Sequence, residues 1–81
     1  MRVGVRLGGA LVQFVESPLL ALELDDGATL ADLYTELGAA HPDLDAAMRS
    51  ALPVLRGAHI DRRQVLAHGD EVALLPPAAG G

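Results

Sequence analysis

The feature that most constrains the fold is one strongly amphipathic helical segment with short runs of alternating apolar residues on both sides of it. Four apolar residues recur at the spacing i, i+3, i+4 and i+7 of a single helix face, namely Leu30, Leu33, Tyr34 and Leu37. Residues 2–7 and 71–75 instead alternate with the period of strands that are buried on one side. A helix and strands of this kind bury their apolar sides against each other, so the sequence predicts an α+β domain.

The start and the end of this helix are marked by particular residues. The hydroxyl of Thr29 can accept a hydrogen bond from the amide of Asp32, which also adds negative charge to the first turn. Pro42 ends the helix, because the residue before a proline, here His41, is pushed out of the helical region. A second and weaker helical stretch is expected over residues 43–52.

The other segments predict short strands and a loop. The expected elements are strand 2–7, loop 11–15, strand 19–24, strand 53–56, a brief edge pairing at 58–60 and strand 71–75. In this order the first and last strands would lie parallel at the centre of a mixed sheet, with the main helix packed across one face. We therefore expect one domain over residues 1–75 and an extended tail over residues 76–81.

Composition narrows the possible functions. The chain has 81 residues, of which 51% are hydrophobic and two are aromatic, so the core is aliphatic and leaves no room for a deep catalytic cavity. The absence of cysteine excludes a disulfide framework, a thiolate nucleophile and a cysteine-ligated metal. The three histidines, His41, His59 and His68, are too scattered to predict a metal site and are expected in solvated loops.

The charge balance points away from nucleic acid and membranes. Eleven carboxylates against six arginines give a formal net charge of -5, and an acidic surface repels nucleic acid and anionic lipid. The sequence contains no uncharged run long enough to cross a bilayer and no complete secretion signal. We expect a cytoplasmic protein whose partners present a basic or an apolar surface.

The residues at the C-terminus are the candidate functional site. Glycine has no Cβ and can pass through a slot that excludes other residues, while Pro76 and Pro77 favour an extended chain. Six residues span at most about 20 Å. The expected reactive atom is the terminal carbon of Gly81, and the residues expected to bind partners are Gly80, Ala79, Ala78, Pro77, Pro76, Leu75 and Ala73. Leu55 and Ile60 are possible additions to this apolar docking patch, and packing of Leu75 under a loop is the alternative left open.

These patterns resemble a known family. The strand-strand-helix-strand-strand order, the Thr-Leu-x-x-Leu start at residues 29–33, the Gly-Asp-Glu-Val turn at 69–72 and the Pro-Pro-x-x-Gly-Gly ending resemble the ubiquitin-like sulfur carriers of the MoaD/ThiS family, which have the β-grasp fold. Over residues 68–81 the chain is similar to the small subunit of molybdopterin synthase. It departs from the family pattern, which usually has Asp at the place of His68, Asn near Arg56 and aromatic residues near Leu74 and Leu75.

The resemblance implies a carrier that is not itself an enzyme. A ubiquitin-activating-like adenylyltransferase would use ATP to form an acyl-adenylate at Gly81, and a sulfur donor protein would displace AMP to leave a thiocarboxylate. The further implied partner is the large subunit of molybdopterin synthase, and no cofactor is bound apart from the covalent sulfur. Three alternatives stay open: a sulfur carrier for thiamine, cysteine or tRNA thiolation, a protein modifier joined through Gly81, and an interaction domain with an inert tail.

Overall fold

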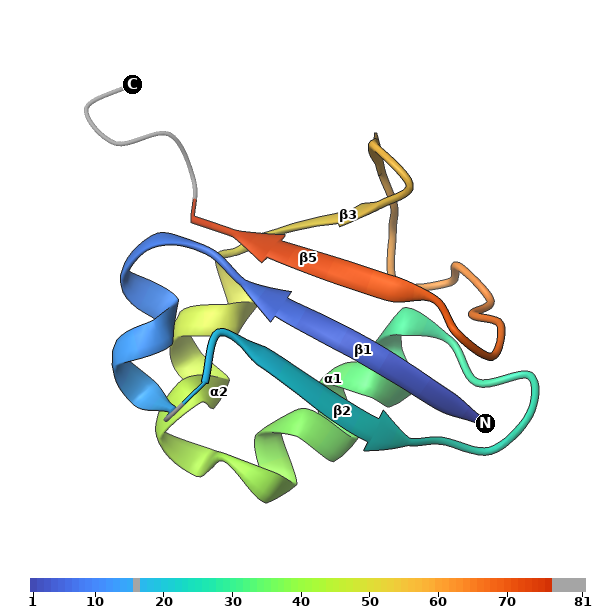
Figure 1. The fold of residues 1–81 in the computed structure, drawn as a ribbon, viewed down its shortest axis with the longest axis horizontal. Coiled ribbons are helices and arrows are strands. Elements are labelled where there is room, and N and C mark those ends of the chain that lie inside the picture. The colour runs from blue at the N-terminus through green and yellow to red at the C-terminus, as the bar shows by residue number, and fades with distance from the viewer. Residues whose placement is uncertain (16, 77–81) are drawn as a thin grey trace.

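A computed structural model describes residues 1–15 and 17–76 of the chain, and Figure 1 shows its arrangement. Its elements in chain order are β1 (Arg2–Leu7), the 3-10 helix η1 (Gly9–Phe14), β2 (Leu19–Glu23), α1 (Leu30–Ala40), α2 (Pro42–Arg49), β3 (Leu52–Leu55), β4 (Ala58–His59) and β5 (Glu71–Leu75). All five predicted strands are present, and so are both predicted helical stretches. The expected α+β class is confirmed.

The strands form one mixed sheet in the order β2-β1-β5-β3-β4. Strands β1 and β5 pair in parallel, with Val5 opposite Val72 and Leu7 opposite Leu74, and the other neighbours are antiparallel. The expectation that the first and last strands are parallel and central is therefore confirmed. Helix α1 runs behind the sheet in the view of Figure 1, and α2 and η1 lie beside it at one end.

The core lies between α1 and one face of the sheet. Each apolar residue of the predicted helix stripe is buried, and the inward residues of β1 and β5 are fully or almost fully buried against it. The largest side chains with essentially no exposure are Leu30, Leu33, Leu37, Leu44, Met48, Leu74, Val3, Val5 and Val72. Burial of each such side chain contributes on the order of 1.5–3 kcal/mol. Among the described residues no polar or charged residue is buried.

Helix α1 begins with the predicted capping arrangement. The amide of Asp32 donates to Thr29 Oγ1 at 3.4 Å, and the amide of Thr29 donates to Asp32 Oδ2 at 2.9 Å. The two bonds together make a capping box in which Asp replaces the usual Glu or Gln. Helix α1 ends at Ala40, one residue before His41, and Pro42 is then the first residue of α2.

Two segments differ from the sequence predictions. Residues 9–14 form η1 rather than an irregular loop, and Leu11 within it is buried in the core. A 3-10 helix of this length leaves no recognisable apolar period in a sequence. Helix α2 ends at Arg49, whereas the prediction extended it to Leu52. Leu52 belongs to β3 because it precedes Pro53, which forces the residue before it into an extended conformation.

No helix in the described part of the chain is both long enough and apolar enough to cross a bilayer.

The capping box predicts a measurable effect on stability. Replacing Thr29 with alanine removes an acceptor for the first turn of α1 and is expected to lower the free energy of unfolding by about 1 kcal/mol. The control is Thr35→Ala on the exposed side of the same helix, where alanine has the higher helix propensity and the free energy should not fall. Urea denaturation followed by circular dichroism compares the two variants. An equal loss in both would contradict a specific role for the cap.

Candidate functional site at the end of the sheet

The C-terminal tail begins at the end of the central parallel pair. Because β1 and β5 are parallel, their last residues lie at the same end of the sheet, as Figure 1 shows. The amide of Gly8 donates to the carbonyl oxygen of Leu74 at 3.0 Å, which extends the pairing beyond β1. Pro76, exposed, follows directly after β5. The other predicted tail residues, Pro77, Ala78, Ala79, Gly80 and Gly81, lie outside the described residues.

The sheet face opposite the helices carries the remaining predicted site residues. Alternation along β5 buries Val72 and Leu74 and places Ala73 and Leu75 on this open face, where Leu75 is 40% exposed and Ala73 is half-buried. Leu75 lies opposite Leu52, which is 38% exposed, and Ala73 lies opposite Val54 in the pairing of β3 with β5. We call these four neighbours, Leu52, Val54, Ala73 and Leu75, the apolar patch.

One predicted contributor to this patch is wrong. Leu55 is 4% exposed and lies opposite Val72, so its side chain belongs to the core and not to the open face. Ile60 is half-buried and packs against the core. Sequence reasoning missed Leu52 and Val54 instead. The available signal was alternation along β3: once Leu55 is assigned to the core, Val54 must face the other way.

The arginines of β1 are paired on the same open face. Arg6 lies beside Ala73, and its Nε is 3.0 Å from Glu71 Oε2 while its Nη2 is 3.4 Å from Glu71 Oε1. The hydrogen bond and the negative charge of Glu71 raise the pKa of Arg6 above its ordinary value. Arg2 Nε is 3.1 Å from Glu23 Oε1. Exposed pairs of this kind stabilise a fold little, but the pair of Arg6 with Glu71 neutralises the charge next to Ala73 of the apolar patch.

The start of β5 is held by side chains of the preceding turn. Asp70 Oδ1 accepts a hydrogen bond from Arg56 Nη1 at 2.6 Å, and its Oδ2 accepts one from the amide of Ala67 at 2.9 Å. The side chain of Asp70 is only 10% exposed. His68 is exposed, as expected for a loop histidine, but its Nδ1 accepts a hydrogen bond from the amide of Arg2 at 3.0 Å. These contacts fasten the turn to β1 and to the connection between β3 and β4.

The position of Arg56 shows why Asn is the more usual residue near this place in the family pattern. Arg56 has φ 51 and Gly57 has φ 79, and the two residues connect the antiparallel strands β3 and β4. Two consecutive residues with positive φ make the turn type that is favoured in two-residue hairpins, where Asn is preferred at the first place. Arginine tolerates this conformation less well than Asn. The ion pair with Asp70 accompanies that less favourable choice.

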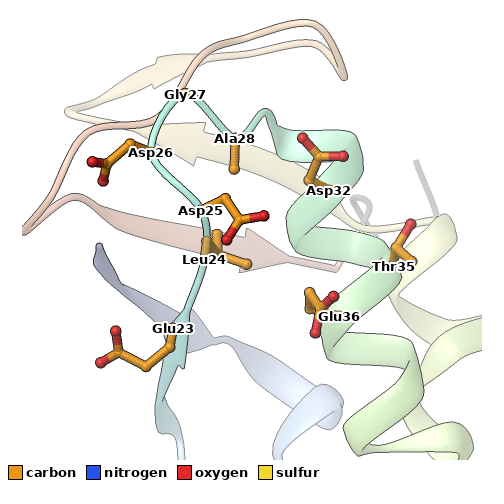
Figure 2. Close-up of a pocket in the computed structure, with 9 residues that line it drawn as sticks. All are labelled: Glu23, Leu24, Asp25, Asp26, Gly27, Ala28, Asp32, Thr35 and Glu36. Carbon is orange, nitrogen blue, oxygen red and sulfur yellow. The ribbon is translucent and has the colours of Figure 1, made fainter.

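An acidic hollow of the surface lies at the end of the sheet away from the tail. Its lining combines the connection between β2 and α1 with the first turns of α1, and Figure 2 shows Asp25, Asp26, Asp32 and Glu36 around it. The hollow adjoins Glu23, which pairs with Arg2 at the start of β1, so the length of β1 separates it from the tail. Within residues 1–15 and 17–76 no group of three or more acidic or histidine side chains is arranged to hold a metal ion.

Comparisons with known proteins agree on one family. The model described as the ThiS family matches residues 5–81. A molybdopterin synthase sulfur carrier subunit from Chlamydomonas reinhardtii is 41% identical over 61 residues, which make up 73% of this chain and 74% of that protein.

Solved structures confirm the fold. The small archaeal modifier protein 1 of Haloferax volcanii is 25% identical with a TM-score of 0.87, and the match covers 95% of this chain and 98% of that chain. A chain in the complex of subunits 1 and 2 of the molybdopterin-converting factor from Helicobacter pylori is 24% identical with a TM-score of 0.73 and covers 100% of both chains, a likeness of fold alone. The expected ubiquitin-like β-grasp fold is confirmed.

The contacts of Asp70 predict that the turn before β5 depends on this side chain. Asp70→Ala removes the acceptor of the Ala67 amide and breaks the pair with Arg56, so the free energy of unfolding should fall by about 1 kcal/mol. Glu36→Ala, on the exposed side of α1, is the control and should change it by less than about 0.5 kcal/mol. Urea denaturation measures both, and a similar value for the two variants would contradict the role of Asp70.

Proposed function

This chain belongs to the ThiS family, and we propose that it is the sulfur carrier subunit of a molybdopterin synthase, carrying sulfur as a thiocarboxylate on Gly81. The observation that carries the proposal is the identity to the sulfur carrier subunit of Chlamydomonas reinhardtii over most of both chains. The protein is a carrier and not an enzyme: other proteins charge its end and take the sulfur from it. The match of the family model as far as Gly81 supports this choice of atom.

The proposed chemistry follows from the poor reactivity of a free carboxylate. A C-terminal carboxyl group is ionised at neutral pH and is a weak electrophile. An adenylyltransferase therefore joins an oxygen of the Gly81 carboxylate to the α-phosphorus of ATP, and pyrophosphate leaves. A donor of sulfur at the oxidation level of sulfide then attacks the acyl carbon and displaces AMP. Sulfur replaces one oxygen, and no cysteine of the carrier takes part, in agreement with its composition.

The site geometry supports separate roles for the two parts: the apolar patch binds the partner, and the tail enters the partner's active site. The apolar patch lies beside the point where the tail leaves β5, so a partner that covers Leu52 and Leu75 is placed next to the tail. We propose that the large subunit of molybdopterin synthase and the adenylyltransferase both bind here and receive residues 76–81 in a narrow channel. Because ATP is needed for charging, we place this cycle in the cytoplasm.

A second candidate function has its own supporting observation. The likeness to the small archaeal modifier protein 1 of Haloferax volcanii favours a protein modifier that is joined through Gly81 to amines of other proteins. The same acyl-adenylate would serve both functions, with an amine in place of sulfur as the nucleophile. Immunoblots of cell extracts separate them: the carrier runs as one free band, and a modifier gives a ladder of larger conjugates.

The charging reaction provides the direct test of the carrier function. Incubation with ATP, sulfide and the cognate adenylyltransferase should change the intact mass by the exchange of one oxygen for one sulfur. Deleting Gly81 should abolish this change and leave the urea midpoint unaltered, because a terminal residue after the last strand contributes little to the core. A wild-type protein that stays uncharged under these conditions would refute the proposal.

The docking role of the patch is tested with a matched pair of substitutions. Leu75→Glu places a carboxylate in the apolar patch and should weaken binding to the large subunit by at least about tenfold. Val65→Glu introduces the same charge at another exposed apolar residue, 56% exposed, in the loop before β5, and should leave the affinity unchanged. Isothermal titration calorimetry measures both. Equal affinities of the two variants would remove the patch from the interface.

A further inference from the structure

We propose that Gly8 and Gly9 are positioning residues that fix the direction in which the tail leaves the sheet. The inference rests on the carrier function proposed above and adds two residues far from the C-terminus in sequence. Its basis is that this glycine pair lies so close to Leu75 and Pro76 that a side chain on either glycine would crowd them. Neither glycine belongs to the tail, to the apolar patch or to a recognisable sequence motif of the site.

The backbone brings the glycine pair against the base of the tail. The amide of Gly8 donates to the carbonyl oxygen of Leu74 at 3.0 Å, and the amide of Leu7 donates to the carbonyl oxygen of Pro18 at 2.7 Å. The turn after β1 is thus tied to β5 on one side and to the segment before β2 on the other. Leu11, two residues further on, is 5% exposed and anchors η1 in the core. The glycine pair is therefore attached to the folded domain on both sides.

At Gly9 a side chain would collide with the ring of Pro76. A Cβ built on Gly9 would be 2.8 Å from Pro76 Cγ, closer than real Cβ atoms approach, and 3.4 Å from Pro76 Cδ. The backbone of Gly9 also has φ +55, in the left-handed region that favours glycine. A Cβ on Gly8 would be 3.0 Å from Leu75 Cδ2, the end of a flexible side chain that can move aside. Gly9 is accordingly the stricter requirement of the two.

Other glycines with positive φ show that this closeness is particular to Gly9. Gly27, Gly57 and Gly69 have φ between +79 and +88, and a Cβ on any of them would meet nothing within 4 Å. At these three positions glycine is required only by the positive φ of the backbone. Gly9 meets the same demand and in addition leaves room for the proline ring, which cannot rotate away because it is closed onto its own backbone.

The contact between Gly9 and Pro76 matters because the tail is long, so a small change of direction at Pro76 moves the terminal carbon far from its place in a binding channel. The five residues after Pro76 reach at most about 18 Å, so a tilt of about 20° at Pro76 would move the end of an extended tail by up to about 6 Å. Misplacement of a reacting group by about 1 Å can already slow a reaction strongly. Holding the ring of Pro76 against Gly9 aims the tail in one direction, so that the terminal carbon is placed for the chemical step.

The test compares Gly9→Ala with Gly27→Ala in the charging reaction. Both substitutions put a side chain at a positive φ, so both should shift the urea midpoint by a similar amount, but only Gly9→Ala pushes on Pro76. We expect Gly9→Ala to lower the kcat of charging by about tenfold or more, with a KM close to that of the wild type because the apolar patch is intact. Gly27→Ala should leave kcat and KM unchanged.

A double-mutant cycle with Pro76→Ala separates positioning from a general loss of structure. Alanine at position 76 keeps the Cβ, which would lie 3.8 Å from the new Cβ at position 9, an ordinary contact, and removes the Cγ and Cδ that collide. Pro76→Ala alone should slow charging, because the ring no longer packs on Gly9. Adding Gly9→Ala to it should cause little further loss.

Three results would overturn the inference while the wild type is charged normally. These are a kcat for Gly9→Ala equal to that of Gly27→Ala, a loss carried by KM instead of kcat, and independent effects of Gly9→Ala and Pro76→Ala. If Gly9→Ala does not fold, the Pro76→Ala variant decides alone, and unchanged charging by it would refute the role of the contact. A wild type that cannot be charged would instead refute the carrier function.

Discussion

The parallel pairing of β1 with β5 is the interaction on which the rest of the structure depends. It joins the two ends of the chain in sequence, Arg2–Leu7 and Glu71–Leu75, and places their inward residues opposite each other beneath α1. Because the two strands run in the same direction, the turn after β1 meets the residues after β5 at one end of the sheet. The site at the base of the tail therefore combines residues more than sixty positions apart.

Both ends of β5 are fixed by contacts outside the core. At its start Asp70 accepts hydrogen bonds from Arg56 and from the amide of Ala67. At its end the carbonyl oxygen of Leu74 accepts a hydrogen bond from the amide of Gly8. A strand held in this way cannot slide along its neighbours, since a shift of one residue would turn its apolar side chains to the open face. The same constraint places the apolar patch and the beginning of the tail in a constant relation to each other.

Local signals in the sequence were sufficient for the elements but not for the surfaces that they build. The stripe of Leu30 and Leu33, the cap at Thr29 and the stop at Pro42 each act within a few residues, so they predicted α1 closely. Leu55 is only a possible addition to the docking patch on the sequence alone, and its pairing with Val72 assigns it to the core. The 3-10 helix η1 was also not predicted, because its six residues make only two turns, too few for a period of three to be recognised.

The sequence by itself determined the fold class and the chemical character of the tail, because alternation, capping and the properties of proline and glycine act between neighbouring residues. The order of the elements predicted the parallel central strands. Tertiary structure alone decided which residues surround the base of that tail. Leu52 meets Leu75 and Gly9 meets Pro76 through strand register and a turn that closes on a distant strand. Such contacts depend on the three-dimensional path of the chain, and no spacing along the sequence encodes them.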